Sequence, residues 1–431
     1  MRPARGTRLT RLLVWYATFL VVCVYGDNSA SSSRAQAEVV YEWVTVDYDW
    51  PSDDVKHQFE QDGRYVPSHN LVSGVKTYKG QVYLSVPRLR YTNGVPSTLN
   101  QVVQKGNQSV LRPFPSWEWQ ELGNCSALQC AMSMEVDPIS GHMYVIDVGR
   151  SGFFGDVSND SAPVVCPAKL VVFDLADGHL VRSHDFPEDL VSKETNFLND
   201  IVLDRGNALS TQVRWVHITD AIDAKLVTFS LETNLSHTVH HSSMDADPGL
   251  GSDITVNGQT FKLVTPIDGL AMSADFQYLY FCPLGSRDLY QVPSDIVRYP
   301  GEDFANSVRF VGSKISQTGG MTYATNNLFY GALTRNGVYR WEVSKDERDQ
   351  GVDASNVLLK TETELVHDDE KLQWPDSFTI DESGFLWFTA CRAQLFLLGD
   401  MDFQGTQGAN FRVWRVNISE KGYLATPGSS L

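Results

Sequence analysis

The stretch Pro266–Ser294, PIDGLAMSADFQYLYFCPLGSRDLYQVPS, decides how the rest of the chain is interpreted. It begins with an Asp-Gly pair, continues as an apolar strand, turns at Ser273–Asp275 and returns as the strand Tyr278–Phe281. A loop then leads to a third strand, Asp288–Val292. Strand, tight turn, strand, loop, strand is the pattern of one blade of a β-propeller.

The second strand of this unit recurs along the chain. Six short strands rich in aromatic or β-branched residues each follow a polar turn: Gln81–Val86, His142–Asp147, Arg214–Ile218, Tyr278–Phe281, Leu328–Ala332 and Phe385–Thr389. Six repeats of about sixty residues predict an all-β fold, a six-bladed propeller occupying residues 39–431. We expect the N-terminal strand near residues 39–46 to pair with the C-terminal strand near residues 410–416, because an unclosed ring would expose two sheet edges.

The first 26 residues have the features of a secretory signal peptide. Four arginines precede the apolar run Leu12–Tyr25, which ends at Gly26 and is too short for a membrane-spanning helix. A signal anchor is the alternative interpretation. Residues 27–38 are expected to be a disordered lead-in. The sequence therefore predicts a secreted, extracellular protein with no membrane attachment after cleavage.

The chain is acidic, with a formal net charge of −17 at pH 7. Such a balance disfavours nucleic acid as a partner and favours cations, including protonated amines. Solubility alone is the simpler explanation of the charge. Nothing in the sequence predicts an oligomeric state.

Secretion sets further expectations for cysteines and asparagines. Cys23 would leave with the signal peptide, and the five remaining cysteines are Cys125, Cys130, Cys166, Cys282 and Cys391. We expect Cys166 to pair with Cys125 or Cys130, and as a second choice Cys282 with Cys391, leaving one thiol over. Five N-x-S/T sequons are candidate glycosylation sites: Asn107, Asn124, Asn159, Asn234 and Asn417.

The chain resembles the Yellow and major royal jelly protein family over nearly its whole mature length. The motifs that carry the resemblance are Val86–Arg88, Gly94–Asn100, Val145–Gly149, Phe197–Asp200, Tyr280–Tyr290, Trp374–Ser377 and Asn410–Arg412. The resemblance implies a six-bladed propeller. Members of this family include salivary proteins that bind biogenic amines, proteins tied to pigmentation and Yellow relatives described as dopachrome-converting. Where the family commonly has Ser-Asn-Arg, this chain has Ala390–Arg392.

Polar residues at the starts of predicted inner strands are the candidate ligand site. Asn199, Asp200, Asp268 and Asp376 each precede or begin a strand that should run along the propeller axis. Grouped oxygen ligands suit Ca²⁺ or a similar hard cation, or the ammonium group of an amine. Asp200 and Asp376 are the candidate metal ligands, and they resemble the metal-binding positions of gluconolactonase-type propellers. Turn and strand-cap roles are the competing explanation, above all for the Asp-Gly pair at Asp268.

Arg392 follows the sixth repeated strand and is a further candidate ligand contact, with structural ion pairing as the alternative. The sequence has no Gly-x-Ser-x-Gly, no His-Glu-x-x-His and no phosphate loop, so no catalytic residue can be named. We therefore favour a protein that binds a small ligand, with an aromatic amine as the candidate. The alternative is an enzyme, either a dopachrome-converting isomerase or a metal-dependent, lactonase-like hydrolase. No cofactor is required by the sequence, and Ca²⁺ is the one candidate.

Overall fold

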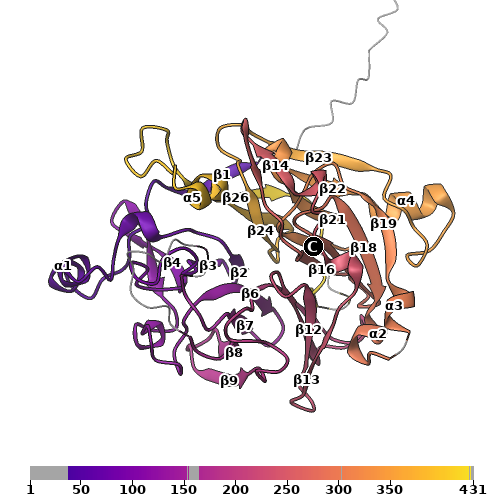
Figure 1. Cartoon of the computed structure of the whole chain (residues 1–431), viewed down its shortest axis with the longest axis horizontal. Helices are drawn as coiled ribbons and strands as arrows, with labels where there is room; N and C mark the ends of the chain where they lie inside the picture. The colour runs from indigo at the N-terminus through magenta and orange to yellow at the C-terminus, as the bar shows by residue number, and fades with distance from the viewer. Residues whose placement is uncertain (1–36, 153, 155–164, 302, 427, 429–431) are drawn as a thin grey trace, which may run out of the picture. The chain divides into compact units, whose positions relative to one another are not determined.

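The computed structural model describes residues 37–152, 154, 165–301, 303–426 and 428, and it contains six four-stranded antiparallel sheets (Figure 1). From the inner to the outer strand, the first three blades are β2 (Val75–Tyr78), β3 (Gln81–Ser85), β4 (Leu99–Lys105) and β5 (Gln108–Pro113); β6 (Ala131–Asp137), β7 (His142–Asp147), β8 (Lys169–Asp174) and β9 (Leu180–Asp185); β10 (Leu198–Asp204), β11 (Trp215–Asp220), β12 (Lys225–Ser230) and β13 (Ser236–Val239).

The second half of the ring has the same construction. Its blades are β16 (Ile267–Met272), β17 (Tyr278–Pro283), β18 (Asp288–Pro293) and β19 (Arg309–Ser313); β20 (Met321–Tyr323), β21 (Leu328–Ala332), β22 (Gly337–Trp341) and β23 (Glu362–His367); β24 (Pro375–Ile380), β25 (Phe385–Ala390), β26 (Phe411–Asn417) and β1 (Glu38–Trp43). Each of the six strands that the sequence repeat picked out is the second strand of a blade. The stretch Pro266–Ser294 supplies three strands of the fourth blade.

The remaining elements lie in the connections between blade strands. They are the helices α1 (Asp53–Gln61), α2 (Ser294–Arg298), α3 (Phe304–Ser307), α4 (Val343–Gln350) and α5 (Ala393–Leu398), the 3₁₀ turns η1 (Pro67–His69), η2 (Glu118–Gln120), η4 (Ser242–Met244), η5 (Leu250–Ser252) and η6 (Leu333–Arg335), and the hairpin β14 (Asp253–Val256) with β15 (Gln259–Lys262). Among the described residues, no helix combines the length and apolar character needed to cross a membrane.

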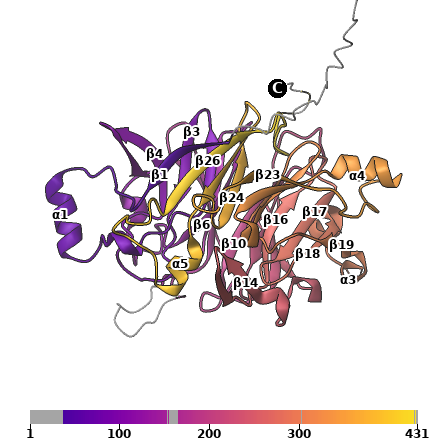
Figure 2. The same ribbon diagram turned by 90° about the horizontal axis from the view of Figure 1, so that it is seen from above.

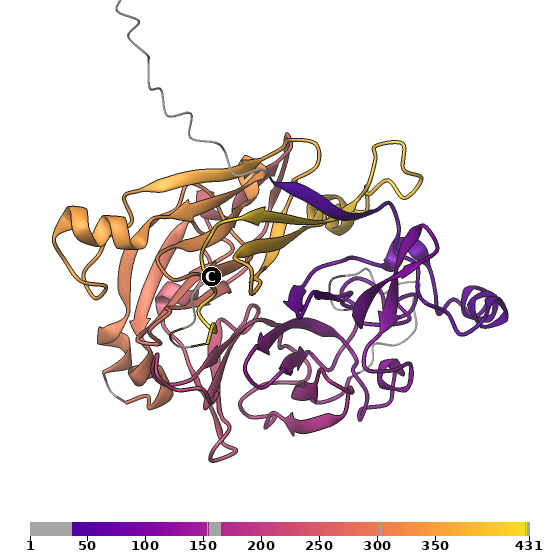
Figure 3. The ribbon, with the colours of Figure 1, turned by 180° about the vertical axis from the view of Figure 1, so that it is seen from behind.

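The ring closes between the two ends of the chain. β1 pairs antiparallel with β26, so the N-terminal strand becomes the outer strand of the sixth blade (Figure 3). The expected six-bladed propeller and its closure are confirmed. Inner strands of neighbouring blades pack side by side around the axis, and second strands such as β21 are buried along their full length. Burial on both faces explains why these strands read as continuous apolar runs.

The two ends of the central channel are covered by different segments. The β14–β15 hairpin and α5 lie on one face, and the C-terminal segment lies on the other (Figure 2). On the hairpin, Phe261 stacks on Trp374 with ring centroids 6.0 Å apart. On the opposite face, Gly422 bridges to Ala324, and the buried Tyr423 follows it.

The hydroxyl of Tyr423 ties the C-terminal segment to two inner strands. It accepts a hydrogen bond from the backbone N–H of Leu203 at 3.0 Å and donates to the carboxylate of Glu135 at 3.3 Å. We expect Tyr423→Phe to lower the free energy of unfolding by about 1–3 kcal/mol, because it leaves a buried N–H without a partner. Urea denaturation measures this. Tyr299→Phe is the control, since Tyr299 is 70% exposed, and an equal loss in both variants would contradict the assignment.

One expected disulfide forms. Cys125 and Cys166 are bonded across a separation of 41 residues, with their Cα atoms 5.4 Å apart. Of the two partners considered for Cys166, Cys125 is therefore the one that pairs. Cys130 is a buried free thiol, and burial, with the nearby charge of Asp147, raises its pKa to about 12.

The expected pairing of Cys282 with Cys391 is wrong, because both are buried free thiols. Cys282 lies on β17 in the fourth blade, where its sulfur meets that of Met321 at 3.9 Å. Cys391 follows β25 in the sixth blade and contacts the carbonyl of Trp374. The fifth blade stands between them, so the two sulfurs cannot meet.

The predicted processing sites are only partly within the described residues. The signal peptide (residues 1–26) and the sequon at Asn159 lie outside them, as does the predicted lead-in up to residue 36. The other sequon asparagines are all exposed, and they are Asn107, Asn124, Asn234 and Asn417. Each is thus accessible for glycosylation in an extracellular protein.

Candidate functional site

β-Bulges at the starts of inner strands present the candidate polar residues to the channel. In β10 the pairing with β11 jumps from Leu198 to Ile201, so Asn199 and Asp200 fall in the irregular segment. The same break passes over Asp268 in β16, and over Asp376 and Ser377 in β24. A bulge leaves residues unpaired and re-aims their side chains, which is why these polar groups face the axis instead of a neighbouring sheet.

Threonines on the second strands satisfy the backbone groups that the bulges release. The hydroxyl of Thr219 accepts from the N–H of Asp200 at 3.0 Å and donates to the carbonyl of Asp268 at 2.9 Å. Thr389 plays the same part in the sixth blade, accepting from Ser377 and donating to the carbonyl of Ser73. Each threonine thereby links its own bulge to the inner strand of the next blade.

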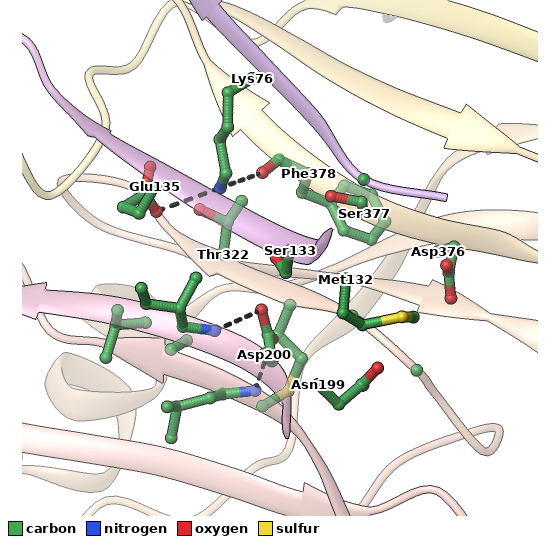
Figure 4. Close-up of a pocket in the computed structure, with 18 of the residues that line it drawn as sticks. Lys76, Met132, Ser133, Glu135, Asn199, Asp200, Thr322, Asp376, Ser377 and Phe378 are labelled. Atoms are coloured by element: carbon green, nitrogen blue, oxygen red, sulfur yellow. Dashed lines mark hydrogen bonds and ion pairs between the residues drawn. The ribbon is translucent and has the colours of Figure 1, made fainter. Parts of the chain in front are cut away.

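The inner strands surround a small central cavity of about 30 Å³ (Figure 4). Its polar lining consists of Ser73, Lys76, Ser133, Glu135, Asn199, Asp200, Thr322, Tyr323, Asp376, Ser377 and Tyr423. The cavity brings together Asn199, Asp200 and Asp376 as the sequence predicted. Asp268 lies directly beside it, since its carboxylate accepts a hydrogen bond from the side-chain amide of Asn199.

The carboxyl groups at and beside this cavity all have raised pKa values. Burial raises the pKa of Asp200 to about 7, although the charge of Lys76 and two backbone hydrogen bonds oppose the shift. Burial also raises the pKa of Asp268 well above its ordinary value, and the charges of Asp376 and Asp200 add to this rise. The pKa of Asp376 is raised by burial despite hydrogen bonds from Ser73 and Trp374. Two acidic groups that resist ionisation thus line the cavity, and a third lies beside it.

Among these three groups, Lys76 opposes the rise in pKa only at Asp200. Among the described residues that line the cavity it is the only basic side chain, and its ammonium pairs with Glu135 at 3.1 Å and donates to the carbonyl of Phe378 at 2.8 Å. The Lys76–Glu135 pair is internally neutral. The site therefore favours a cation supplied from outside.

The contacts of each carboxylate differ. Both oxygens of Asp200 accept backbone N–H groups, from Ile201 and Leu270, at 3.0 Å each. Asp376 accepts from the hydroxyl of Ser73 at 2.9 Å and from the indole of Trp374 at 3.3 Å. In the described part of the chain, no cluster of three His, Cys, Asp or Glu side chains is close enough to hold a metal ion. A Ca²⁺ site at these residues stays a prediction from the sequence, since Ca²⁺ also takes amide and backbone carbonyl oxygens.

Arg392 is not part of the central cavity. It lines a separate pocket next to α5, together with Gln373 and Gln394. Sequence reasoning missed Lys76, Glu135 and Tyr423, which do line the cavity. An inner-strand Lys or Glu resembles an ordinary solvent-facing residue when the strand pairing is unknown, and Tyr423 belongs to no blade.

The family of the chain follows from comparison with known proteins. The family model described as Major royal jelly protein matches residues 129–422. The chain belongs to the major royal jelly protein family. It is 27% identical over 428 residues to Major royal jelly protein 7 of Apis mellifera, covering 96% of this chain and 92% of that protein. It is 26% identical over 412 residues to Protein yellow of Drosophila subobscura, covering 91% and 67% of the two.

The resemblance noted from the sequence motifs is confirmed by these matches. Among solved structures, a luciferin-regenerating enzyme aligns over 86% of this chain and 97% of its own, with a TM-score of 0.43 and 12% identity.

One hydrogen-bonded constellation in this royal jelly family protein has the connectivity of a catalytic triad. In the third blade the hydroxyl of Thr228 lies 2.9 Å from Nδ1 of His217, and Nε2 of that ring lies 3.1 Å from Asp204. All three side chains are completely buried, and Asp204 also pairs with Arg298 at 2.6 Å. No substrate can reach such a group, so this arrangement is a packing network between blades.

Proposed function

We propose that this protein is a secreted binding protein whose central cavity holds the ammonium group of a small amine, with a biogenic amine as the ligand. The observation that carries the proposal is that Asp200 and Asp376 line one cavity and Asp268 lies beside it, with no unpaired basic side chain among the described lining residues. Bringing a cation to this point relieves both the desolvation of the carboxylates and their mutual repulsion.

The size of the cavity limits what enters it. A volume of about 30 Å³ holds one or two water-sized groups, which is the size of an ammonium group and too small for an aromatic ring. The rest of the ligand must lie further out, toward Trp374, whose indole already contacts Asp376, and Phe261, which stacks on it. These rings offer an aromatic amine a stacking surface once they move apart.

Secretion is supported by several independent features. A disulfide joins Cys125 to Cys166, and disulfides persist in oxidising compartments. Four sequon asparagines are exposed. The N-terminal sequence has the basic and apolar regions of a signal peptide.

Calorimetric titration tests the proposal with a matched pair of ligands. 2-Phenylethylamine and 2-phenylethanol have the same ring and chain, and only the amine carries a positive charge. We expect the amine, dopamine and serotonin to give binding heat and the alcohol to give none. Equal binding of the amine and the alcohol, or no heat with any amine, would contradict the proposal.

Proton transfer is the second candidate function, because a carboxylate whose pKa is about 7 suits a general base. Asp200 is that group, and an isomerisation such as dopachrome conversion needs a proton moved. A turnover assay with dopachrome separates the two candidates. Turnover by the wild type that disappears in Asp200→Ala would favour the enzyme, and binding without turnover would exclude it.

A further inference from the structure

A second polar pocket is lined by residues of α5 and of the β14–β15 hairpin. Both elements lie on the same face of the propeller (Figure 2). The volume of this pocket is about 220 Å³, and it is lined by Val256, Asn257, Gln259, Glu370, Gln373, Arg392, Gln394, Leu395 and Gln407. It shares no lining residue with the central cavity. Drug-sized sites measure roughly 300–1,000 Å³, so this pocket suits a smaller ligand.

Arg392 brings to this pocket a positive charge that has no direct ion pair among the described residues. Its side chain is buried, at 7% exposure, and no carboxylate among the described residues lies within ion-pair distance of it. Its Nη2 donates to the carbonyls of Glu370 at 3.0 Å and Gln407 at 3.1 Å, whereas Nε and Nη1 have no partner. Burial and the nearby charge of Arg412 lower the pKa of Arg392, although the charges of Asp402 and Glu370 oppose the shift. A buried cation in this state is stabilised by an anion.

A second buried residue in the pocket, Gln394, has an acceptor oxygen without a donor, whereas Arg392 has donor nitrogens without an acceptor. Gln394 is 1% exposed, and its amide nitrogen donates to the side-chain oxygen of Gln373 at 2.8 Å. Gln373 in turn donates to the carbonyl of Asp369 at 2.9 Å, which fixes the orientation of both amides. The side-chain oxygen of Gln394 is thereby left as a buried acceptor without a donor.

Arg392 and Gln394 together call for a ligand that has both a negatively charged group and a hydrogen-bond donor. We propose that the pocket binds a small carboxylate with an adjacent hydrogen-bond donor, an α-amino or α-hydroxy acid, through the guanidinium of Arg392 and the amide oxygen of Gln394. Charge-assisted hydrogen bonds to the carboxylate compensate the arginine. The adjacent donor satisfies the glutamine. Glu370 also lines the pocket, but it is exposed to solvent, which screens its repulsion of an anion.

Three compounds of nearly the same shape test this assignment by calorimetry in a buffer free of other carboxylates. L-Lactate carries a carboxylate and a hydroxyl, L-alanine a carboxylate and an ammonium, and lactamide is the neutral amide of lactate. We expect at least one of the two acids to bind ten-fold or more tightly than lactamide. The stronger acid identifies the adjacent donor. Equal affinities for lactamide and both acids, or no binding of either acid, would overturn the proposal.

Variants at Arg392 complete the test. Arg392→Gln should abolish binding of the acid, and Arg392→Lys, which keeps the charge but loses the planar set of donors, should bind it more weakly than the wild type and more tightly than Arg392→Gln. Arg348→Gln on α4 is the matched control, because it removes one arginine charge at an exposed position that does not line the pocket. Acid binding by Arg392→Gln at wild-type affinity would also overturn the proposal. The comparison of acids with lactamide on the wild type decides the matter even where Arg392→Gln fails to fold.

The outcome is independent of the proposed amine site. Asp268→Asn removes a carboxylate at the central cavity and should bind the acid as the wild type does, since the two sites share no lining residue. A protein that binds the acid and no amine would contradict only the proposed function.

Discussion

Asp268→Asn should weaken amine binding roughly 10- to 100-fold, which is the range for losing one hydrogen bond to a charged group. The same substitution should stabilise the ligand-free protein at pH 8. Asp268 is 4% exposed, and burial and two neighbouring carboxylates raise its pKa. Such a group contributes stability that is complete below its unfolded pKa and is lost as the pH rises through its folded pKa. A neutral side chain removes that loss.

The asparagine fits the same position. One oxygen of Asp268 accepts from the amide of Asn199, and asparagine keeps that oxygen. No described group donates to the other oxygen, so the new NH₂ group meets no opposing donor. We therefore expect the free energy of unfolding of Asp268→Asn at pH 8 to exceed that of the wild type. At pH 4 the gain should shrink, because the wild-type carboxyl is then neutral.

Urea denaturation at the two pH values and calorimetry with 2-phenylethylamine measure both effects. Asp349→Asn on α4 makes the same change of charge at an exposed position and should alter neither quantity beyond about 0.5 kcal/mol. Asp200→Asn is expected to destabilise instead, because both of its oxygens accept backbone N–H groups. Wild-type amine affinity in a stabilised Asp268→Asn protein would remove Asp268 from the ligand site.

The blades were predictable from the sequence because their signal is local. Each second strand, such as Tyr278–Phe281, follows its turn directly, and its apolar run reflects burial on both faces. Closure of the ring by β1 and β26 followed from the need to cover two edges. Asn199, Asp200 and Asp376 were found for the same local reason, since they stand at the starts of inner strands.

The rest of the site depends on non-local pairing. The bulge that contains Asp200 is defined by the pairing of β10 with β11. The register of that pairing cannot be derived from the sequence of β10 alone. Lys76 and Glu135 form a pair across two blades, and Tyr423 reaches the cavity from beyond the last blade. Arg392 was placed with the acidic residues because it follows a blade strand, yet it lies in a different pocket.

Amine affinity should rise steeply between pH 5.5 and pH 8. The ammonium group of the ligand, like that of lysine, stays protonated over this range, so the titrating partners are the carboxylates. Burial raises the pKa of Asp200 to about 7 and also raises those of Asp268 and Asp376. At pH 5.5 Asp200 holds a proton that a cation must displace. The affinity should therefore increase up to ten-fold per pH unit for each proton released.

Calorimetry in two buffers of different ionisation enthalpy counts the released protons directly. We expect about half a proton per amine bound near pH 7, because Asp200 is half protonated there. The rise of amine affinity with pH distinguishes this site from a surface ion pair. Surface carboxylates are already fully ionised at pH 5.5, so their affinity for the amine does not change between pH 5.5 and pH 8. Asp349→Asn should reproduce the wild-type slope, and Asp268→Asn should lower the affinity at pH 8 more than at pH 5.5. An affinity independent of pH would mean that the ammonium group does not meet these carboxylates.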